Sequence, residues 1–190
     1  SLIATTSKSS DARAHREGRH TARGPRLAEG RTAEVFAWGD DRALKLFRPG
    51  RSYEAAEREA RQARIAHESG APAPAVHGVL LDDGRPGILM DRADGHPMSA
   101  AIDLARPAPV ARALAELHAS VHARRAPQLP SQHEELARRI DRAQGLTAAQ
   151  KRHAQSRLDA LPHGDALCHG DFHLDNIVLI QQYVAGPEYR

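Results

Sequence analysis

An acid and an amide lie five positions apart in the stretch CHGDFHLDN, which covers residues 168–176. The acid, Asp171, can accept the proton of an attacking hydroxyl, and the amide, Asn176, can ligate a Mg²⁺ that shields transferring phosphate. Phosphoryl transfer needs this combination because its barrier falls mainly through positioning and charge neutralisation. A polar surface turn explains the pattern less well, because the whole string leads into the apolar run 177–180.

A second His-Gly-Asp lies upstream, at residues 163–165, and it lacks the partner amide. Protein kinases place an Asn five positions after the catalytic Asp. Asp171 meets this spacing, whereas the residue five positions after Asp165 is Gly170, which has no side chain to ligate a metal. We therefore assign the upstream copy to a turn that precedes a strand-like segment, residues 166–168.

Lysine is rare in this chain, and Lys45 is one of only three lysines among 27 basic residues. It lies in the apolar segment 43–47, and the helical segment that follows carries Glu54, Glu57 and Glu59. In kinases a strand lysine contacts the α- and β-phosphates and pairs with a helix glutamate. Glu59 is the preferred partner here and Glu57 is nearly as good. The alternative is an edge-strand lysine that extends its amine to water.

A turn with the sequence GRTAE, residues 30–34, separates two expected strands. Its exposed backbone N–H groups, beginning at Gly30, and the Thr32 hydroxyl can cup a phosphate. With a single glycine, the pattern alone is equally typical of an ordinary hairpin turn.

Two kinds of structure must position these residues. Up to Asp91, short apolar runs alternate with turns rich in Gly and Asp, which is typical of antiparallel hairpins with one helix between them. After Asp91, apolar residues at spacings of four, three and four in segment 109–125 predict an amphipathic helix. The expected strands are 34–38, 43–47, 76–81 and 87–90 with one more before Gly30, and the expected helices are 52–68, 109–125, 134–142 and 148–161.

The fold class is therefore α+β with two lobes. Residues 1–22 lack the periodicity and apolar content that folding requires, so they are predicted to form a disordered tail. Residues 23–91 form the first lobe, a small sheet with one helix, and residues 92–190 form a mainly helical second lobe.

Composition limits the classes of function. With 41% hydrophobic residues and no apolar run near the roughly 20 residues of a membrane span, the chain is expected to be globular and not membrane-bound. The polar N-terminal segment does not match a secretory signal, and a single cysteine suits a reducing cytoplasm. A nucleic-acid-binding module is the least supported function, because the net charge of +3 comes from scattered arginines with only 4% aromatic residues.

Two smaller features have ordinary structural explanations. His118 and His122 lie one helical turn apart, but no third ligand is placed near them, so His118 is expected to pack between helices. Cys168 precedes Asp171 in an expected buried strand, so a packed thiol is expected rather than a nucleophile.

From about residue 27 to residue 179 the chain resembles the aminoglycoside phosphotransferase family, kinase-like small-molecule kinases with choline- and homoserine-kinase relatives. The resemblance depends above all on CHGDFHLDN, with support from GRTAEVFAWGDDRALKLF, HESGAPAPAVHG, RPGILMDRADG and LAELHASVH. It implies a protein-kinase-like fold with a nucleotide-binding first lobe. It also implies use of ATP and Mg²⁺ to transfer the γ-phosphate to a hydroxyl of a small molecule.

The same resemblance implies a role for each matching residue. Asp171 is the catalytic base, Asn176 a Mg²⁺ ligand, Lys45 the phosphate-contacting lysine and Glu59 its partner. The other nucleotide-binding positions are Gly30 and Thr32 near the phosphates and Met90, Arg92 and Ala93 in the linker whose backbone meets the adenine.

The sequence departs from the family pattern after Asn176. Family members continue with a short hairpin and an Asp that holds the principal Mg²⁺, whereas residues 177–190 contain Glu188 as their only acid. We therefore expect an incomplete helical lobe, and a truncated, catalytically inactive domain that binds nucleotide or a partner is the alternative function. The acceptor alternatives are aminoglycoside-, choline- or homoserine-like alcohols, because fold-level similarity does not choose among them.

Overall fold

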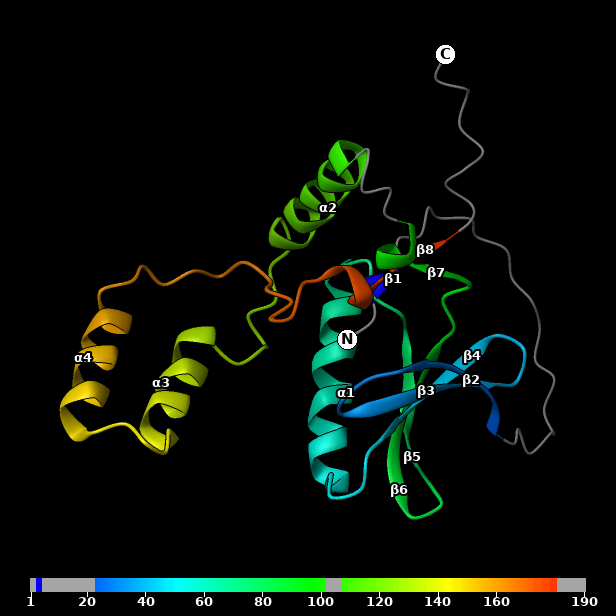
Figure 1. The fold of residues 1–190 in the computed structure, drawn as a ribbon, viewed down its shortest axis with the longest axis horizontal. Coiled ribbons are helices and arrows are strands. Elements are labelled where there is room, and N and C mark those ends of the chain that lie inside the picture. Colours follow the sequence, from blue (N-terminus) through cyan, green and yellow to red (C-terminus); the bar gives the residue numbers. More distant parts are fainter. Residues whose placement is uncertain (1–2, 5–22, 102–106, 181–190) are drawn as a thin grey trace.

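A computed structural model describes residues 3–4, 23–101 and 107–180 of the chain (Figure 1). Residues 3–4 form a short strand, β1 (Ile3–Ala4). The rest of the segment that the sequence predicts to be a disordered tail lies outside the described residues. The end of the predicted second lobe, residues 181–190, lies outside them as well.

Within residues 23–91, five strands form an antiparallel sheet in the order β2-β3-β4-β6-β5. The strands are β2 (Arg23–Glu29), β3 (Ala33–Trp38), β4 (Arg42–Phe47), β5 (Val76–Asp82) and β6 (Arg85–Asp91). Both predicted hairpins and the extra strand before Gly30 are therefore confirmed. The β5–β6 turn has positive φ at Asp83 and at Gly84, the backbone that two-residue hairpin turns require.

Lys45 lies in the middle of this sheet rather than at an edge. Its backbone pairs with Val35 of β3 on one side and with Ile88 of β6 on the other. The alternative of an edge-strand lysine is therefore wrong.

Trp38, the sole tryptophan of the chain, ends β3 opposite Arg42 of β4.

Helix α1 (Tyr53–Glu68) covers one face of the sheet (Figure 1). Ser52 caps its N-terminus, because the Ser52 hydroxyl accepts the N–H of Ala55 at 3.2 Å. Gly70 follows its C-terminus with φ of +82°, a backbone conformation that favours glycine. These ends agree with the predicted helix. Its buried residues Ala56 and Ala60 pack in one apolar cluster with Ala33, Ala43, Phe47, Ile88 and Met90 of the sheet.

The part of the chain after Asp91 is mainly helical. Its elements are β7 (Gly95–Pro97), the 3₁₀ turn η1 (Met98–Ala101), α2 (Pro107–His122), α3 (Gln132–Arg142), α4 (Ala148–Asp159), the 3₁₀ turn η2 (Leu174–Asn176) and β8 (Ile177–Ile180). Strand β8 lies between β7, which is antiparallel to it, and β1, which is parallel to it. Helices α3 and α4 pack side by side (Figure 1). Among residues 3–4, 23–101 and 107–180, no helix has both the length and the apolar content needed to cross a membrane.

Residues 166–168 do not form the predicted strand. Ala166 makes an isolated bridge with Arg125, and the Leu167 N–H donates to the Arg124 carbonyl at 2.9 Å. A single bridge provides no ladder along which a strand could extend. Leu167 is buried, but Cys168 is exposed, so the prediction of a packed thiol is wrong.

A second apolar cluster lies beneath the CHGDFHLDN loop. Leu117 and Val121 of α2 pack with Met98, Leu167 and Ile177, and Ile177 has no exposed surface. Burial of such side chains stabilises a fold by roughly 1.5–3 kcal/mol each. The core therefore fixes the backbone on both sides of Asp171 and Asn176.

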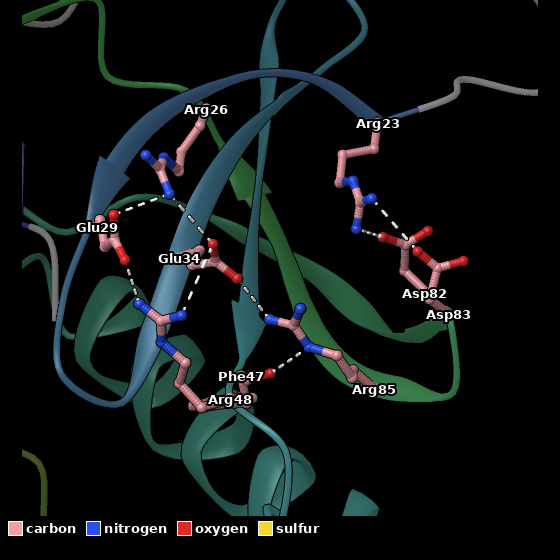
Figure 2. A network of polar contacts seen from close by, with 9 residues as sticks. All are labelled: Arg23, Arg26, Glu29, Glu34, Phe47, Arg48, Asp82, Asp83 and Arg85. Atoms are coloured by element: carbon pink, nitrogen blue, oxygen red, sulfur yellow. Dashed lines mark hydrogen bonds and ion pairs between the residues drawn. The ribbon is translucent and has the colours of Figure 1, made fainter.

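A polar network on the sheet surrounds Glu34 of β3, which is only 9% exposed (Figure 2). Its carboxylate accepts from Arg85 of β6 at 2.7 Å and from Arg26 of β2 at 3.5 Å, and the Arg48 guanidinium lies 3.9 Å away. Arg48 also pairs with Glu29. The hydrogen bond from Arg85 is the main reason that the pKa of Glu34 lies below its usual value. The network joins β2, β3, β6 and the end of β4 through one carboxylate.

Candidate active site

The loop that carries Asp171 is shaped by a glycine and anchored by apolar side chains. Gly170 has φ of +79°, which allows the chain to turn immediately before Asp171. Phe172 and Leu174 pack against the cluster that contains Ile177. In η2, the Asn176 N–H donates to the His173 carbonyl at 3.0 Å. The turn therefore brings Asn176 back towards Asp171.

The predicted acid and amide are in direct contact. Nδ2 of Asn176 donates to the Asp171 carbonyl at 2.9 Å and to Oδ2 of the Asp171 carboxylate at 3.1 Å. This contact orients the carboxylate of the Asp171 side chain, which is 72% exposed, and leaves Oδ1 of Asn176 as an acceptor for another group. His173 also belongs to the cluster, with Nε2 at 3.0 Å from Nδ2 of Asn176 and 3.6 Å from Oδ2 of Asp171. His173 is a site residue that the sequence analysis missed.

His169 supports the backbone of Asp171. Its Nδ1 accepts the Asp171 N–H at 3.3 Å, so the remaining proton of the neutral ring lies on Nε2. Nε2 is buried and has no hydrogen-bond partner among the described residues. Burial lowers the pKa of His169, which keeps the ring neutral at neutral pH.

The upstream His-Gly-Asp has a different environment. Asp165 forms an exposed ion pair with Arg125, and the His163 ring stacks on His133 with ring centroids 4.3 Å apart. Neither residue contacts Asp171 or Asn176. The two copies of the tripeptide therefore differ in structure as well as in spacing.

Lys45 forms an ion pair with a glutamate of α1. Its Nζ lies 2.6 Å from Oε1 of Glu59, and the Lys45 side chain is only 16% exposed. Of the two glutamates that the sequence left open, the structure therefore pairs Glu59 with the lysine, and Glu57 is exposed. Arg51 takes the other oxygen, with Nη2 at 2.8 Å from Oε2 of Glu59. Nothing in the spacing of an arginine-rich chain distinguishes Arg51 from its neighbours, so the sequence analysis missed it.

A cavity of about 660 Å³ connects these two clusters. The first lobe contributes Lys45, Arg51, Glu59 and Met90 to its wall, and the CHGDFHLDN segment contributes Asp171. Its other lining residues include Ile88, Val121, Leu167, Cys168, His169 and Gly170. Residues far apart in the sequence thus line one cavity. Asn176 does not line it, but it contacts Asp171, which does.

Four predicted nucleotide-binding residues lie outside this wall. The Gly30 N–H donates to the Ala33 carbonyl within the turn at 2.8 Å, and the Thr32 carbonyl accepts the N–H of Arg48, which follows β4, at 2.9 Å. In the linker between β6 and β7, the Arg92 side chain pairs with Asp94 at 2.7 Å. The other residue outside the wall is Ala93. Roles for these residues stay predictions.

Comparison with known proteins identifies the family. A profile of the phosphotransferase enzyme family matches residues 23–186, which is most of the chain. The chain belongs to the phosphotransferase enzyme family. A search of curated proteins found no match.

Two solved structures of phosphotransferases share the fold. Aminoglycoside phosphotransferase APH(3'')-Id from Streptomyces rimosus, in complex with ADP and streptomycin, is 20% identical with a TM-score of 0.51. The match covers 77% of this chain and 63% of that protein. An aminoglycoside-3'-phosphotransferase of type VIII is 22% identical with a TM-score of 0.55, over 86% of this chain and 67% of the other. The predicted α+β, protein-kinase-like fold is thereby confirmed, and the chain spans about two thirds of the length of these phosphotransferases.

A phosphotransferase of this kind is expected to use Mg²⁺, and the described residues include possible ligands for the ion. Nowhere in the described part of the chain do three or more His, Cys, Asp or Glu side chains gather as a preformed metal cluster. Mg²⁺ does not require such a cluster, because it is usually held by one or two protein oxygens together with substrate phosphates and water. Oδ1 of Asn176 and the exposed Asp171 carboxylate are oxygen donors of this type, so the residues fit the ion.

The histidine pair of α2 does not pack between helices as predicted, because both residues are exposed. The rings of His118 and His122 lie with centroids 4.0 Å apart, and His118 lies 4.7 Å from the Phe172 ring. His118 therefore contacts the loop that carries Asp171, whereas its other ring neighbour, His122, lies on the same helix.

Proposed function

We propose that this chain is the nucleotide-binding and catalytic part of an ATP-dependent phosphotransferase that transfers the γ-phosphate to a hydroxyl of a small molecule. The observation that supports it best is the shared cavity. Lys45 with its glutamate partner lies on one wall, and Asp171 lies on the other. Neither half by itself distinguishes a phosphotransferase from an ordinary ion pair or a polar loop.

Residues 23–91 form the nucleotide-binding lobe in this proposal. Lys45 contacts the α- and β-phosphates, and Glu59 fixes its position. Met90, 7% exposed, gives the adenine an apolar wall, with the backbone of Arg92 and Ala93 beside it. The family resemblance also assigns Gly30 and Thr32 to the phosphates, although neither residue lines the cavity. A volume of about 660 Å³ is within the range of small-molecule sites.

Residues from position 92 onward carry the catalytic loop. Asn176 would hold Mg²⁺ through Oδ1, and the ion would supply neutralisation of charge on the transferring phosphoryl group. Asp171 faces the acceptor. Its carboxylate takes the proton of the acceptor hydroxyl while the hydroxyl oxygen bonds to the γ-phosphorus and ADP departs with the bridging oxygen. The Asn176 amide keeps Oδ2 of Asp171 oriented for this step.

The structural neighbours support the classes of substrate in this proposal. One structural neighbour was solved with ADP and streptomycin, which supports an adenine nucleotide and a small-molecule acceptor. Aminoglycoside-, choline- or homoserine-like alcohols are the candidate acceptors. A cytoplasmic location, where ATP and a reduced Cys168 are expected, completes the proposal.

The experiment that tests the proposal compares Asp171→Asn with the parent chain. ATP turnover is followed with a panel of alcohols, and Mg-ATP binding is followed by calorimetry. We expect turnover to fall by at least about 100-fold because the general base is lost, while binding changes by less than about twofold. Asp165→Asn is the matched control, since it makes the same change in the other His-Gly-Asp, and it should keep the parent's turnover.

Two outcomes contradict this proposal in different ways. Unchanged turnover in Asp171→Asn would show that Asp171 is not the base. Binding of Mg-ATP without turnover in the parent would instead support the nucleotide-binding, catalytically inactive domain.

A further inference from the structure

Glu59 forms ion pairs with two basic side chains at once, and only one of them has a role in the proposed function. Lys45 lies 2.6 Å from Oε1, and Arg51 lies 2.8 Å from Oε2. Arg51 comes from the connection between β4 and α1, not from the strand or the helix. It reaches the cavity wall together with Lys45 and Glu59.

The charge of this triad favours an anion. One carboxylate faces two cations, so the group carries a net positive charge at neutral pH. Arg51 stays charged throughout the physiological range, and its guanidinium carries five N–H donors in a fork that matches phosphate oxygens. The contact with Glu59 uses Nη2, and the N–H groups on Nη1 and Nε are additional donors. Its side chain is 43% exposed, so a bound anion can reach it.

Local structure places Arg51 with little freedom. Gly50, immediately before Arg51, has φ of +95°, a conformation that side-chain-bearing residues rarely adopt. The Arg51 guanidinium then lies 5.0 Å from the centre of the Phe47 ring, over which Nζ of Lys45 lies at 5.5 Å. Phe47 is only 2% exposed and provides a rigid base. Both cations are therefore held over one buried ring, which limits the entropy lost when they bind an anion.

We propose that Arg51 is a second phosphate-binding cation of the nucleotide site and acts beside Lys45. The inference rests on the proposed function and adds a residue that nothing else assigns to the site. Arg51 binds a non-bridging oxygen of the polyphosphate. It also retains Glu59 in position while the Lys45 amine turns towards the phosphates.

A purely structural role for Arg51 gives a different expectation. If Arg51 only tethered Glu59 and the start of α1, its loss would lower stability and weaken every ligand of the cavity alike. A phosphate contact instead weakens ATP and ADP and leaves adenosine unaffected, since adenosine has no phosphate. A charge contact also makes ATP binding more sensitive to salt in the parent than in the variant.

The test measures binding of ATP, ADP and adenosine by calorimetry to the parent, Arg51→Gln, Arg51→Lys and Arg61→Gln, all in the presence of Mg²⁺. Arg61 is an exposed arginine of α1 outside the cavity wall and serves as the matched control. We expect Arg51→Gln to weaken ATP and ADP about tenfold, as for loss of a charge-assisted hydrogen bond, and to leave adenosine within about twofold. Arg51→Lys should recover part of the loss, and Arg61→Gln should match the parent.

Each other result overturns the inference. Parent-like ATP binding by Arg51→Gln would show that Arg51 does not contact phosphate while the proposed function stands. Equal losses for ATP and adenosine, with a lowered thermal midpoint, would assign Arg51 the structural role. Failure of the parent itself to bind ATP would overturn the proposed function and this inference together.

Discussion

Glu59 is the residue on which the cation geometry of the cavity depends. Its two oxygens hold Lys45 and Arg51 apart, and its own side chain is 30% exposed. Without the negative charge, two cations would lie close together over the Phe47 ring with no carboxylate between them. Repulsion between them would then move one cation away from the wall.

Replacing Glu59 by Gln should therefore weaken both the fold and nucleotide binding. We expect the free energy of unfolding to fall by about 1 kcal/mol, because a partly exposed ion pair contributes on this scale. Denaturant unfolding at neutral pH measures the change, and calorimetry with Mg-ATP should show a raised Kd.

Glu57→Gln is the natural control for this variant. It makes the same change two positions away on α1, where the side chain is exposed, and should alter unfolding by less than about 0.5 kcal/mol. Equal effects of the two substitutions would show that the Lys45–Glu59 contact contributes nothing specific.

At the scale of elements, Glu34 links strands of the sheet that are not hydrogen-bonded neighbours. Strand β6 is not a neighbour of β3, yet Arg85 of β6 donates to Glu34 of β3 at 2.7 Å. The same Arg85 donates through Nε to the Phe47 carbonyl at 2.9 Å, at the end of β4 (Figure 2). The network therefore spans β4 on the surface of the sheet.

This network is expected to make the free energy of unfolding fall at acidic pH. The pKa of Glu34 is lowered from its usual value of 4.5 mainly by the hydrogen bond with Arg85, so the folded state binds this proton less readily than the unfolded state. The resulting stabilisation is present above the unfolded pKa and is lost as the pH falls through the folded pKa. We expect Glu34→Gln to be less stable than the parent near pH 7, and to lose less stability than the parent between about pH 5 and pH 3. Denaturant midpoints across this range measure it, and parallel acid profiles for the two proteins would contradict it.

Local signals in the sequence were sufficient for most elements. The Asp83-Gly84 turn, the Ser52 cap and the Gly70 stop each depend on neighbouring residues, so the hairpins and α1 could be predicted. Residues 166–168 illustrate the limit, because their apolar pattern matched a strand but the fold offers them only the backbone near Arg125 as a partner.

The site divides in the same way. The contact between Asp171 and Asn176 is local, so its spacing could be read directly. Arg51 could not be recognised, because its contact with Glu59 forms only in the folded chain. His173 could not be recognised either, because nothing in the sequence distinguishes it from the other eleven of the twelve histidines. The choice between Glu57 and Glu59 required the register of α1 against β4, which the sequence does not specify.

At the scale of the whole molecule, the cavity joins the sheet-containing lobe to the helical part. Its wall combines Lys45 and Met90 of the sheet with Val121 of α2 and Leu167 beside the loop that carries Asp171. A ligand that fills it contacts both parts and stabilises only the state in which they are together.

Mg-ADP should therefore raise the stability of the chain in a concentration-dependent way. At about 100 times its Kd we expect the free energy of unfolding to rise by about 2.7 kcal/mol through mass action. Thermal unfolding with and without the ligand measures the change. Lys45→Met should show a much smaller rise at the same ligand concentration, and an unchanged parent midpoint at saturating ligand would count against a nucleotide site.

The position of Trp38 at the end of β3 has a practical consequence for such measurements. Because Trp38 is the sole tryptophan and pairs with Arg23 of β2 as well as Arg42 of β4, emission excited selectively from tryptophan reports on this end of strands β2, β3 and β4. Melting of α2, α3 or α4 would leave that emission unchanged and appear only in the far-ultraviolet circular dichroism. If the two unfolding curves superimpose, the sheet and the helical part unfold in a single cooperative transition. If the curves are separated, they show which of the two parts unfolds first.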